Sequence, residues 1–307
     1  MSTPVTGRFA PTPSGRLHLG NLLCALLAYL SARHAGGRFL LRIEDLDAPR
    51  CPKHLCDAAI QDLTWLGITW DEPPLFQSER GEVYQRYARQ LEQKGLLYPC
   101  FCTRAQLHAA AAPNRGDDNP VYAGTCAHLS PEEIAERMKT RRPAIRLRVP
   151  DETISIWDRQ YGEYSEYMPR DCGDFIIRRS DGLFGYQLAV VVDDALSGVN
   201  EVVRGHDILA STPRQVYIQR VLGFDTPSYI HIPLLEDADG RRLAKRDRDM
   251  DLTSLAKRFS REDILGMLAY SAGILEEERP AAMDELIDVF DWKNVKKEDI
   301  RLGRAIG

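Results

Sequence analysis

The chain has 307 residues, of which 28% are charged, and its formal net charge is −5 at pH 7. This length can bury a sizeable core and suits one elaborated domain or two to three modest ones. The negative net charge excludes a uniformly basic nucleic-acid-binding surface, so any RNA contact has to come from local basic patches. The sequence shows no signal peptide and no apolar span of membrane length, and we therefore expect a cytoplasmic protein.

The N-terminal segment predicts a strand, a tight loop and the start of a helix. Residues 8–10 have the character of a strand end, residues 11–15 supply chain breakers, and residues 21–30 form an apolar run of helix length. A helix N-terminus presents unpaired N–H groups and the positive end of the peptide dipoles, so it is a natural phosphate site. Gly20 would let a nucleotide approach the backbone, and His18 would donate a hydrogen bond to a phosphate. The alternative makes His18 a surface loop histidine and Gly20 a turn residue.

The next segment continues an alternation of strands and helices. Residues 38–43 predict a buried parallel-type strand, and residues 56–66 and 83–96 predict helices. A βαβα beginning is typical of a parallel sheet, in which ligands bind at the carboxyl ends of the strands. Glu44 directly follows such a strand end and is therefore a candidate ligand-binding residue.

The character of the chain changes after residue 97. Breakers and cysteines precede the strand-like residues 144–149 and 175–178, which predicts an insertion between two halves of a nucleotide-binding fold. Seven cysteines in a protein that is expected to be cytoplasmic indicate thiols or metal rather than a disulfide scaffold.

Three of these cysteines predict a metal site in the insertion. Cys100, Cys102 and Cys126 plus one further donor would form a tetrahedral, structural zinc site. From the residues alone, His128 and His108 compete for the fourth position, and the alternative is three free cysteines. A second cluster of Cys51, His54 and Cys56 is better explained by helix packing and capping than by metal.

Beyond the insertion, the sheet is predicted to resume. Residues 187–192 and 199–203 are expected to be strands, residues 215–222 a helix, and the region of Ile230 a further strand. A basic loop at residues 240–250 holds Lys245 centrally, where a mobile cationic loop can neutralise charge on a departing pyrophosphate. Residues 252–259, 262–273 and 283–290 predict a small helical terminal unit. The alternative for the basic loop is a solvated hairpin tip.

Two segments carry a resemblance to a known family. GRFAPTPSGRLHLGN at residues 7–21, followed by residues 36–47, is similar to the opening of glutamyl-tRNA synthetases, whose HIGH-type motif corresponds to residues 18–21 here. RLAKR at residues 242–246 resembles the second ATP-handling signature of class I aminoacyl-tRNA synthetases, the KMSKS-type loop. Arg242, Ala244 and Arg246 depart from that loop's pattern and leave Lys245 as the chief match. The resemblance covers about residues 7–259.

The resemblance implies an α/β class I synthetase fold with a Rossmann-like parallel sheet, a zinc-containing insertion and a small C-terminal helical unit. Because the chain extends only about sixty residues past the basic loop, too few for a domain of typical size, we expect no anticodon-binding domain. The chain thus resembles a truncated paralog of the glutamyl-tRNA synthetases. The expected domains are the first half of the catalytic domain at 1–97, the zinc-containing acceptor-binding-type insertion at 98–186, the second catalytic half at 187–250 and the helical remnant at 251–307.

The resemblance also implies the site residues. Free glutamate carries two carboxylates and one ammonium, so its pocket needs cationic groups and one fixed carboxylate. Glu44 is expected to bind the ammonium and Arg204 the side-chain carboxylate; alternatively these two form an ordinary ion pair, and Tyr186 belongs to the core. The implied L-glutamate site comprises Arg8, Ala10, Pro11, Thr12, Glu44, Tyr186 and Arg204. The implied ATP site comprises His18, Gly20, Asn21 and Lys245, of which His18, Asn21 and Lys245 are also the implied catalytic residues. The implied zinc ligands are Cys100, Cys102, Tyr122 and Cys126.

The implied activity has two steps. Glutamate and ATP with Mg²⁺ would form glutamyl-adenylate without tRNA, and glutamate would then pass to the queuosine base at the wobble position of tRNA(Asp). One structural Zn²⁺ and a monomeric state are expected. The alternatives are a compact glutamyl-tRNA synthetase that charges tRNA(Glu), and a catalytically silent paralog that binds tRNA.

Overall fold

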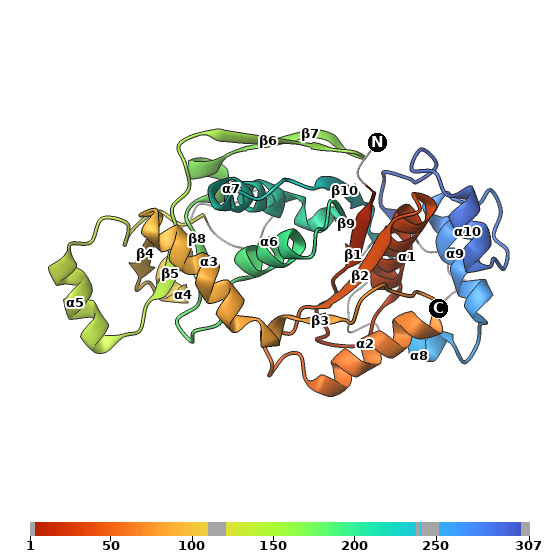
Figure 1. Cartoon of the computed structure of the whole chain (residues 1–307), viewed down its shortest axis with the longest axis horizontal. Coiled ribbons are helices and arrows are strands. Elements are labelled where there is room, and N and C mark those ends of the chain that lie inside the picture. Colours follow the sequence, from red (N-terminus) through yellow and green to blue (C-terminus); the bar gives the residue numbers. More distant parts are fainter. Residues whose placement is uncertain (1–3, 110–120, 238–239, 241–251, 302–307) are drawn as a thin grey trace.

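The computed structural model describes residues 4–109, 121–237, 240 and 252–301. Their main feature is a twisted sheet in two parts that meet where β1 lies beside β9 (Figure 1). The strand order across this sheet is β3-β2-β1-β9-β10-β6-β7, and every neighbouring pair with a defined ladder is parallel except the β6–β7 hairpin. The chain therefore has the parallel sheet that the sequence predicts.

The first half alternates strands and helices. Its elements are β1 (Thr6–Phe9), α1 (Leu19–His34), β2 (Arg38–Ile43), α2 (Lys53–Trp65), β3 (Leu75–Phe76), the short helical turn η1 (Gln77–Glu79) and α3 (Gly81–Gln93). Helix α1 is apolar on nearly all sides, and such a helix has to be buried. It lies between the sheet and the C-terminal helices α9 and α10, and most of its residues are buried there.

The insertion forms a second, antiparallel sheet of order β4-β5-β8. Its elements are β4 (Leu97–Cys100), α4 (Arg104–Ala109), α5 (Pro131–Thr140), β5 (Ala144–Leu147), the hairpin β6 (Thr153–Asp158) and β7 (Gly162–Tyr167), the helical turn η2 (Met168–Cys172) and β8 (Phe175–Arg178). The hairpin was not predicted. It leaves the insertion's own sheet, and β6 pairs in parallel with β10 of the main sheet.

The second half corrects one sequence prediction. Its elements are α6 (Tyr186–Leu196), β9 (Glu201–Gly205), the helical turn η3 (His206–Ser211), α7 (Thr212–Leu222), β10 (Ser228–Ile232) and β11 (Leu235–Glu236). Residues 187–192 were expected to form a strand, but they belong to α6. A short apolar run does not distinguish a buried strand from a helix that is buried all round, and residues 188–192 are all buried between α3, α7 and the sheet.

The C-terminal elements are α8 (Leu252–Leu255), α9 (Arg261–Ala272), α10 (Met283–Val289) and β12 (Ile300–Arg301). Helices α9 and α10 share one core with α1 and the first half of the sheet. A second core joins α3, α6 and α7 on the other face. The division into four domains remains a prediction. Among the described residues, no helix combines the length and apolar character needed to cross a membrane.

Helices α1 and α7 therefore cover opposite faces of the sheet. Helix α1 follows strand β1, and helix α7 follows the adjacent strand β9. Because the chain leaves these two strands toward opposite faces of the sheet, the carboxyl ends of β1 and β9 border a crevice. Open α/β sheets bind ligands at such a switch point.

Candidate functional site

A cavity of about 350 Å³, here the main cavity, opens at this switch point. The ends of β1, β2, β9 and β10 and the first turns of α1 and α6 line it. Of the residues predicted for substrate binding, those that line the main cavity are Ala10, Pro11, Thr12, His18, Gly20, Asn21, Glu44, Tyr186 and Arg204. The structure thus brings together side chains that are up to 194 positions apart in the sequence, from Ala10 to Arg204.

His18 caps the N-terminus of α1. Its Nδ1 accepts a hydrogen bond from the Gly20 N–H at 3.1 Å, and the Asn21 Oδ1 accepts one from the His18 N–H at 3.3 Å. Because Nδ1 accepts, a neutral imidazole carries its proton on Nε2, which can donate to a phosphate. A Cβ at position 20 would lie 3.1 Å from the His18 ring, so glycine permits this cap.

Glu44 is buried at the end of β2 and belongs to a charged network. Its Oε2 accepts from the Thr12 hydroxyl at 3.2 Å, and its Oε1 lies 3.2 Å from the Arg42 Nη2. Burial raises the pKa of Glu44, although Arg42 and Arg8 oppose this effect. An ammonium bound here would favour the charged carboxylate.

Arg8 does not line the main cavity. Its guanidinium pairs with Asp194 at 3.2 Å and donates to the Val203 carbonyl at 3.2 Å, and Asp194 also pairs with Arg42. This position is behind Glu44, where Arg8 contributes positive potential rather than a contact with the cavity. Its predicted place in the glutamate site remains a prediction.

Arg204 lines the main cavity from β9 and is 5% exposed. The structure does not pair it with Glu44: each guanidinium nitrogen instead donates to a neutral side chain, from α7 or β10.

The KMSKS-type loop lies outside the described residues, and with it Arg242, Ala244, Lys245 and Arg246.

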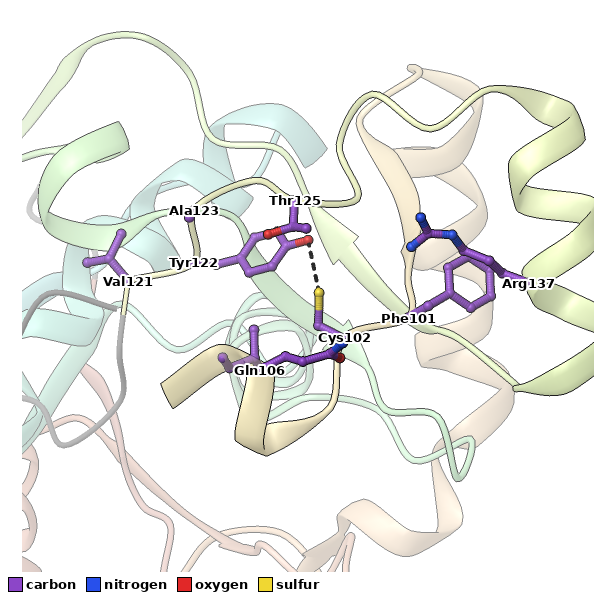
Figure 2. A pocket seen from close by; sticks show the side chains of 9 residues that line it. Phe101, Cys102, Gln106, Val121, Tyr122, Ala123, Thr125 and Arg137 are labelled. Atoms are coloured by element: carbon purple, nitrogen blue, oxygen red, sulfur yellow. Dashed lines mark hydrogen bonds between the residues drawn. The ribbon is translucent and has the colours of Figure 1, made fainter. Parts of the chain in front are cut away.

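The predicted zinc ligands converge in the insertion. The Sγ atoms of Cys100, Cys102 and Cys126 all lie within 4.8 Å of one another, and those of Cys102 and Cys126 are 3.7 Å apart. The Tyr122 hydroxyl lies 3.5 Å from the Cys100 Sγ. It lies 3.7 Å from the Cys102 Sγ, the contact drawn in Figure 2. Zinc with bonds of about 2.3 Å to sulfur and about 2.0 Å to oxygen separates tetrahedral ligands by about 3.5 to 3.8 Å. The residues therefore fit a tetrahedral zinc ion.

Arg146 adds a positive charge to this cluster. Its guanidinium lies 3.7 Å from the centre of the Tyr122 ring. Although burial has the opposite effect, hydrogen bonds from Tyr122 and Arg146 lower the pKa of Cys100. Burial raises the pKa of Tyr122, so a phenolate there requires the positive charge of a metal.

The competing donors are not part of this cluster. In the described part of the chain, the group of close metal-donor side chains consists of the three cysteines and excludes His128, which is exposed. The side chain of His108 lies outside the described residues. Cys51 and Cys56 face the backbone carbonyls of Glu44 and Cys51, which agrees with packing and capping roles.

A second cavity of about 480 Å³, here the adjoining cavity, lies between the main cavity and the zinc cluster. Tyr186, Asp207 and Ile208 line both cavities. The adjoining cavity reaches Tyr122 and Arg146 at its other end. Two reactants bound in the two cavities would therefore meet beside Tyr186 and Asp207.

The family model for the catalytic domain of class I tRNA synthetases (E and Q) matches residues 4–298. The chain belongs to this family. A glutamyl-Q tRNA(Asp) synthetase from Symbiobacterium thermophilum is 48% identical, with 96% of this chain and 95% of the relative covered. A protein of the same name from Geobacter sulfurreducens is 44% identical, with 88% and 83% covered. The crystal structure of a glutamate tRNA ligase from Elizabethkingia meningosepticum in complex with its amino acid superposes with a TM-score of 0.84 at 28% identity and covers 99% of this chain and 68% of that chain.

The comparisons confirm the predicted class I synthetase fold. Sequence reasoning nevertheless missed several residues of this class I synthetase's site. Asp194 bridges Arg8 and Arg42, and His231 contacts Arg204. The paired residues are 27 to 186 positions apart in the sequence, so local spacing could not have revealed these pairings. The signal that was available is the acidic pair at residues 193–194 directly after an apolar run.

Proposed function

We propose that this protein is an ATP-dependent ligase that activates L-glutamate to glutamyl-adenylate without tRNA and transfers glutamate to queuosine at the wobble position of tRNA(Asp). The observation that carries the proposal is the main cavity, which combines a helix N-terminus with one fixed carboxylate and one buried guanidinium. Relatives named glutamyl-Q tRNA(Asp) synthetase that align over nearly their full length support the choice of acceptor. We further infer that the protein acts as a monomer in the cytoplasm.

Glutamate would bind between Glu44 and Arg204. Its ammonium would pair with Glu44, and its side-chain carboxylate would take the N–H groups of Arg204 that the protein leaves available. Tyr186 and Thr12 stand beside these groups and would complete the pocket. This arrangement orients the α-carboxylate toward the N-terminus of α1.

ATP would bind with its phosphates at that helix end. The α-carboxylate oxygen forms a bond to the α-phosphorus, and the bond to pyrophosphate breaks. The N–H groups of the first turn, His18 Nε2 and Asn21 would stabilise the charge that develops. Lys245 is proposed to act on the departing pyrophosphate. Mg²⁺ bound with ATP would neutralise phosphate charge.

The acceptor base would bind in the adjoining cavity. A hydroxyl oxygen of queuosine would form an ester bond with the glutamyl carbonyl carbon, and the bond from that carbon to the phosphate oxygen of AMP would break. The leaving phosphate of AMP would take up the hydroxyl proton. Because Tyr186 and Asp207 border both cavities, the acceptor and the adenylate would approach each other there. Zn²⁺ held by Cys100, Cys102, Tyr122 and Cys126 would fix the far wall of the adjoining cavity, which Tyr122 lines.

The test is an acceptor assay. Purified protein is incubated with ATP, radiolabelled glutamate and, separately, tRNA(Asp) with queuosine, tRNA(Asp) without it, and tRNA(Glu). We expect label on the queuosine-containing tRNA alone. Label on tRNA(Glu) would make the protein a compact glutamyl-tRNA synthetase, a candidate supported by the similarity to a glutamate tRNA ligase. Label on none, with no glutamate-dependent ATP–pyrophosphate exchange, would support a silent tRNA-binding paralog.

A further inference from the structure

Arg204 belongs to a buried chain of hydrogen bonds that extends away from the main cavity. Its Nε donates to the His231 Nε2 at 3.0 Å, and the His231 Nδ1 lies 2.6 Å from the Asp158 Oδ2. Arg204 and His231 are direct partners in the β9–β10 ladder, and Asp158 ends the neighbouring strand β6. His231 and Asp158 are 0% exposed, and neither lines the main cavity.

The order of donors fixes the protonation of His231. A guanidinium can only donate, so the Nε2 of His231 has to accept, and its ring proton has to reside on Nδ1. Nδ1 then donates to Asp158. Burial lowers the pKa of His231 to about 4, so the ring is neutral at ordinary pH, as an acceptor must be.

Asp158 is held as an anion at the end of this chain. Its Oδ1 accepts from the N–H groups of Gln160 and Tyr161 at 2.9 Å each, and its Oδ2 also accepts from the His231 N–H at 3.0 Å. Burial acts against ionisation, but hydrogen bonds from His231 and Tyr161 lower the pKa of Asp158. The carboxylate therefore selects the Nδ1-protonated form of His231.

The other two nitrogens of Arg204 are held from α7. Nη1 donates to the Gln215 Oε1 at 2.7 Å and Nη2 donates to the Thr212 Oγ1 at 2.8 Å. These contacts and the bond to His231 use three of the five guanidinium N–H groups. Within the described residues, two N–H groups remain for a ligand in the main cavity, enough for one bidentate carboxylate.

We propose that Asp158 and His231 are positioning residues that fix the guanidinium plane of Arg204 and thereby set the affinity for the glutamate side chain. The proposal rests on the proposed function. The proposal also goes beyond the proposed function, because His231 and Asp158 would act through Arg204 without contacting glutamate or ATP. The neutral Nε2 acceptor holds Arg204 without cancelling its charge, whereas a carboxylate in the same place would compete with the ligand.

Two substitutions separate the two ends of the histidine. His231→Asn keeps a donor near the Nδ1 position for Asp158 but is too short to accept from Arg204. His231→Gln places an amide oxygen near the Nε2 position and keeps that acceptor. The matched control is His206→Gln, because His206 also pairs with an aspartate, Asp299 at 2.7 Å, and lines neither cavity.

The measurement is ATP–pyrophosphate exchange with glutamate varied at saturating ATP and with ATP varied at saturating glutamate. We expect His231→Asn to raise the KM for glutamate by about tenfold or more and to leave the KM for ATP within about threefold. His231→Gln should stay within about threefold for both, like the control. An unchanged KM for glutamate in a folded His231→Asn variant, or equal increases in the two His231 variants, would overturn the proposal.

A measurement on the unmodified protein tests the proposal if the His231→Asn variant fails to fold. In protein labelled with ¹⁵N-histidine, the nitrogen spectrum should show a histidine whose Nδ1 is protonated and whose Nε2 is not, unchanged between pH 8 and pH 6. His34 also donates from Nδ1, to the Ile287 carbonyl at 2.7 Å, so a variant has to distinguish the two signals. Disappearance of that signal in folded His231→Gln assigns it. A protonated Nε2 at His231 would contradict the relay. Wild-type protein without glutamate-dependent exchange would refute the proposed function instead, and the spectrum would still decide the geometry.

Discussion

Glu44 shows how one buried carboxyl can be kept ready for a cationic ligand. It lies among Arg42, Arg8 and Asp194, so the charges behind the main cavity nearly balance before glutamate binds. Asp194 forms ion pairs with both arginines. The positive charge of Arg42 is therefore shared between Asp194 and Glu44, and the charge of Glu44 is neutralised less fully than in a simple ion pair. An incoming ammonium therefore completes a network that already exists.

Replacement of this carboxyl should impair glutamate binding selectively. Glu44→Gln keeps the shape but removes the charge, and an ammonium in a buried site without its anion loses on the order of 3 kcal/mol. We expect the KM for glutamate in ATP–pyrophosphate exchange to rise about a hundredfold and the KM for ATP to stay within about threefold. Glu92→Gln, on the exposed face of α3, is the control. Equal losses for both substrates would point to a damaged fold.

The same residue predicts a pH dependence. Burial raises the pKa of Glu44 above the ordinary value of 4.5. Glutamate affinity should therefore be complete well above that raised pKa and decline as the pH falls through it, because the protonated carboxyl cannot pair with ammonium. Exchange kinetics across pH 5 to 8 measure the trend. The pH dependence should be absent in Glu44→Gln, and its persistence there would assign it to another group.

Lys245 gives a prediction that rests on the sequence alone. Its place in the KMSKS-type loop predicts that Lys245→Ala lowers the rate of adenylate formation by about a hundredfold or more, because the variant lacks the ammonium that would neutralise negative charge on the departing pyrophosphate. Arg248→Ala, in the same basic segment, provides a control for simple loss of loop charge. Equal exchange rates for wild type and Lys245→Ala would remove Lys245 from the mechanism.

Among the elements, those with a strong local signal were predictable. The apolar run of α1, the strand β2 and the terminal helices lie close to their expected positions. Helix α6 was mistaken for a strand because Val-rich runs suit both buried forms. The β6–β7 hairpin was missed because its pairing with β10 depends on residues far along the chain. Asp158 sits at that hairpin turn, so missing the element also concealed the relay to Arg204.

Helix α9 provides a test of packing between elements. A Cβ at Gly266 would lie 1.7 Å from the Arg279 carbonyl oxygen, so the segment before α10 crosses α9 at a position only glycine allows. Gly266→Ala should destabilise the fold by about 1 to 3 kcal/mol. Gly81→Ala, at the start of α3, meets nothing within 4 Å and should be neutral. Thermal unfolding compares the two variants, and equal midpoints would mean that this crossing relaxes freely.

Across the whole molecule, the two cavities divide the proposed reaction into activation and transfer. The main cavity is built by the sheet and α1, whereas the adjoining cavity is partly built by the insertion. Of these two cavities, the zinc cluster contributes to the lining of the adjoining one alone, through Tyr122. The metal should therefore matter more for the second step than for the first.

Zinc removal tests this division directly. Cys126→Ser removes one ligand, and we expect the zinc content of the purified protein to fall from about one ion per chain to a small fraction. Transfer of glutamate to queuosine-containing tRNA(Asp) should fall by about tenfold or more, because the far wall of the adjoining cavity loses its fixed position. Glutamate-dependent ATP–pyrophosphate exchange should change by less than about threefold. The control is Cys56→Ser, because Cys56 is buried like Cys126, lines neither cavity and contacts the backbone carbonyl of Cys51. If Cys126→Ser slowed exchange and transfer by the same factor, the insertion would support the whole fold rather than the acceptor side.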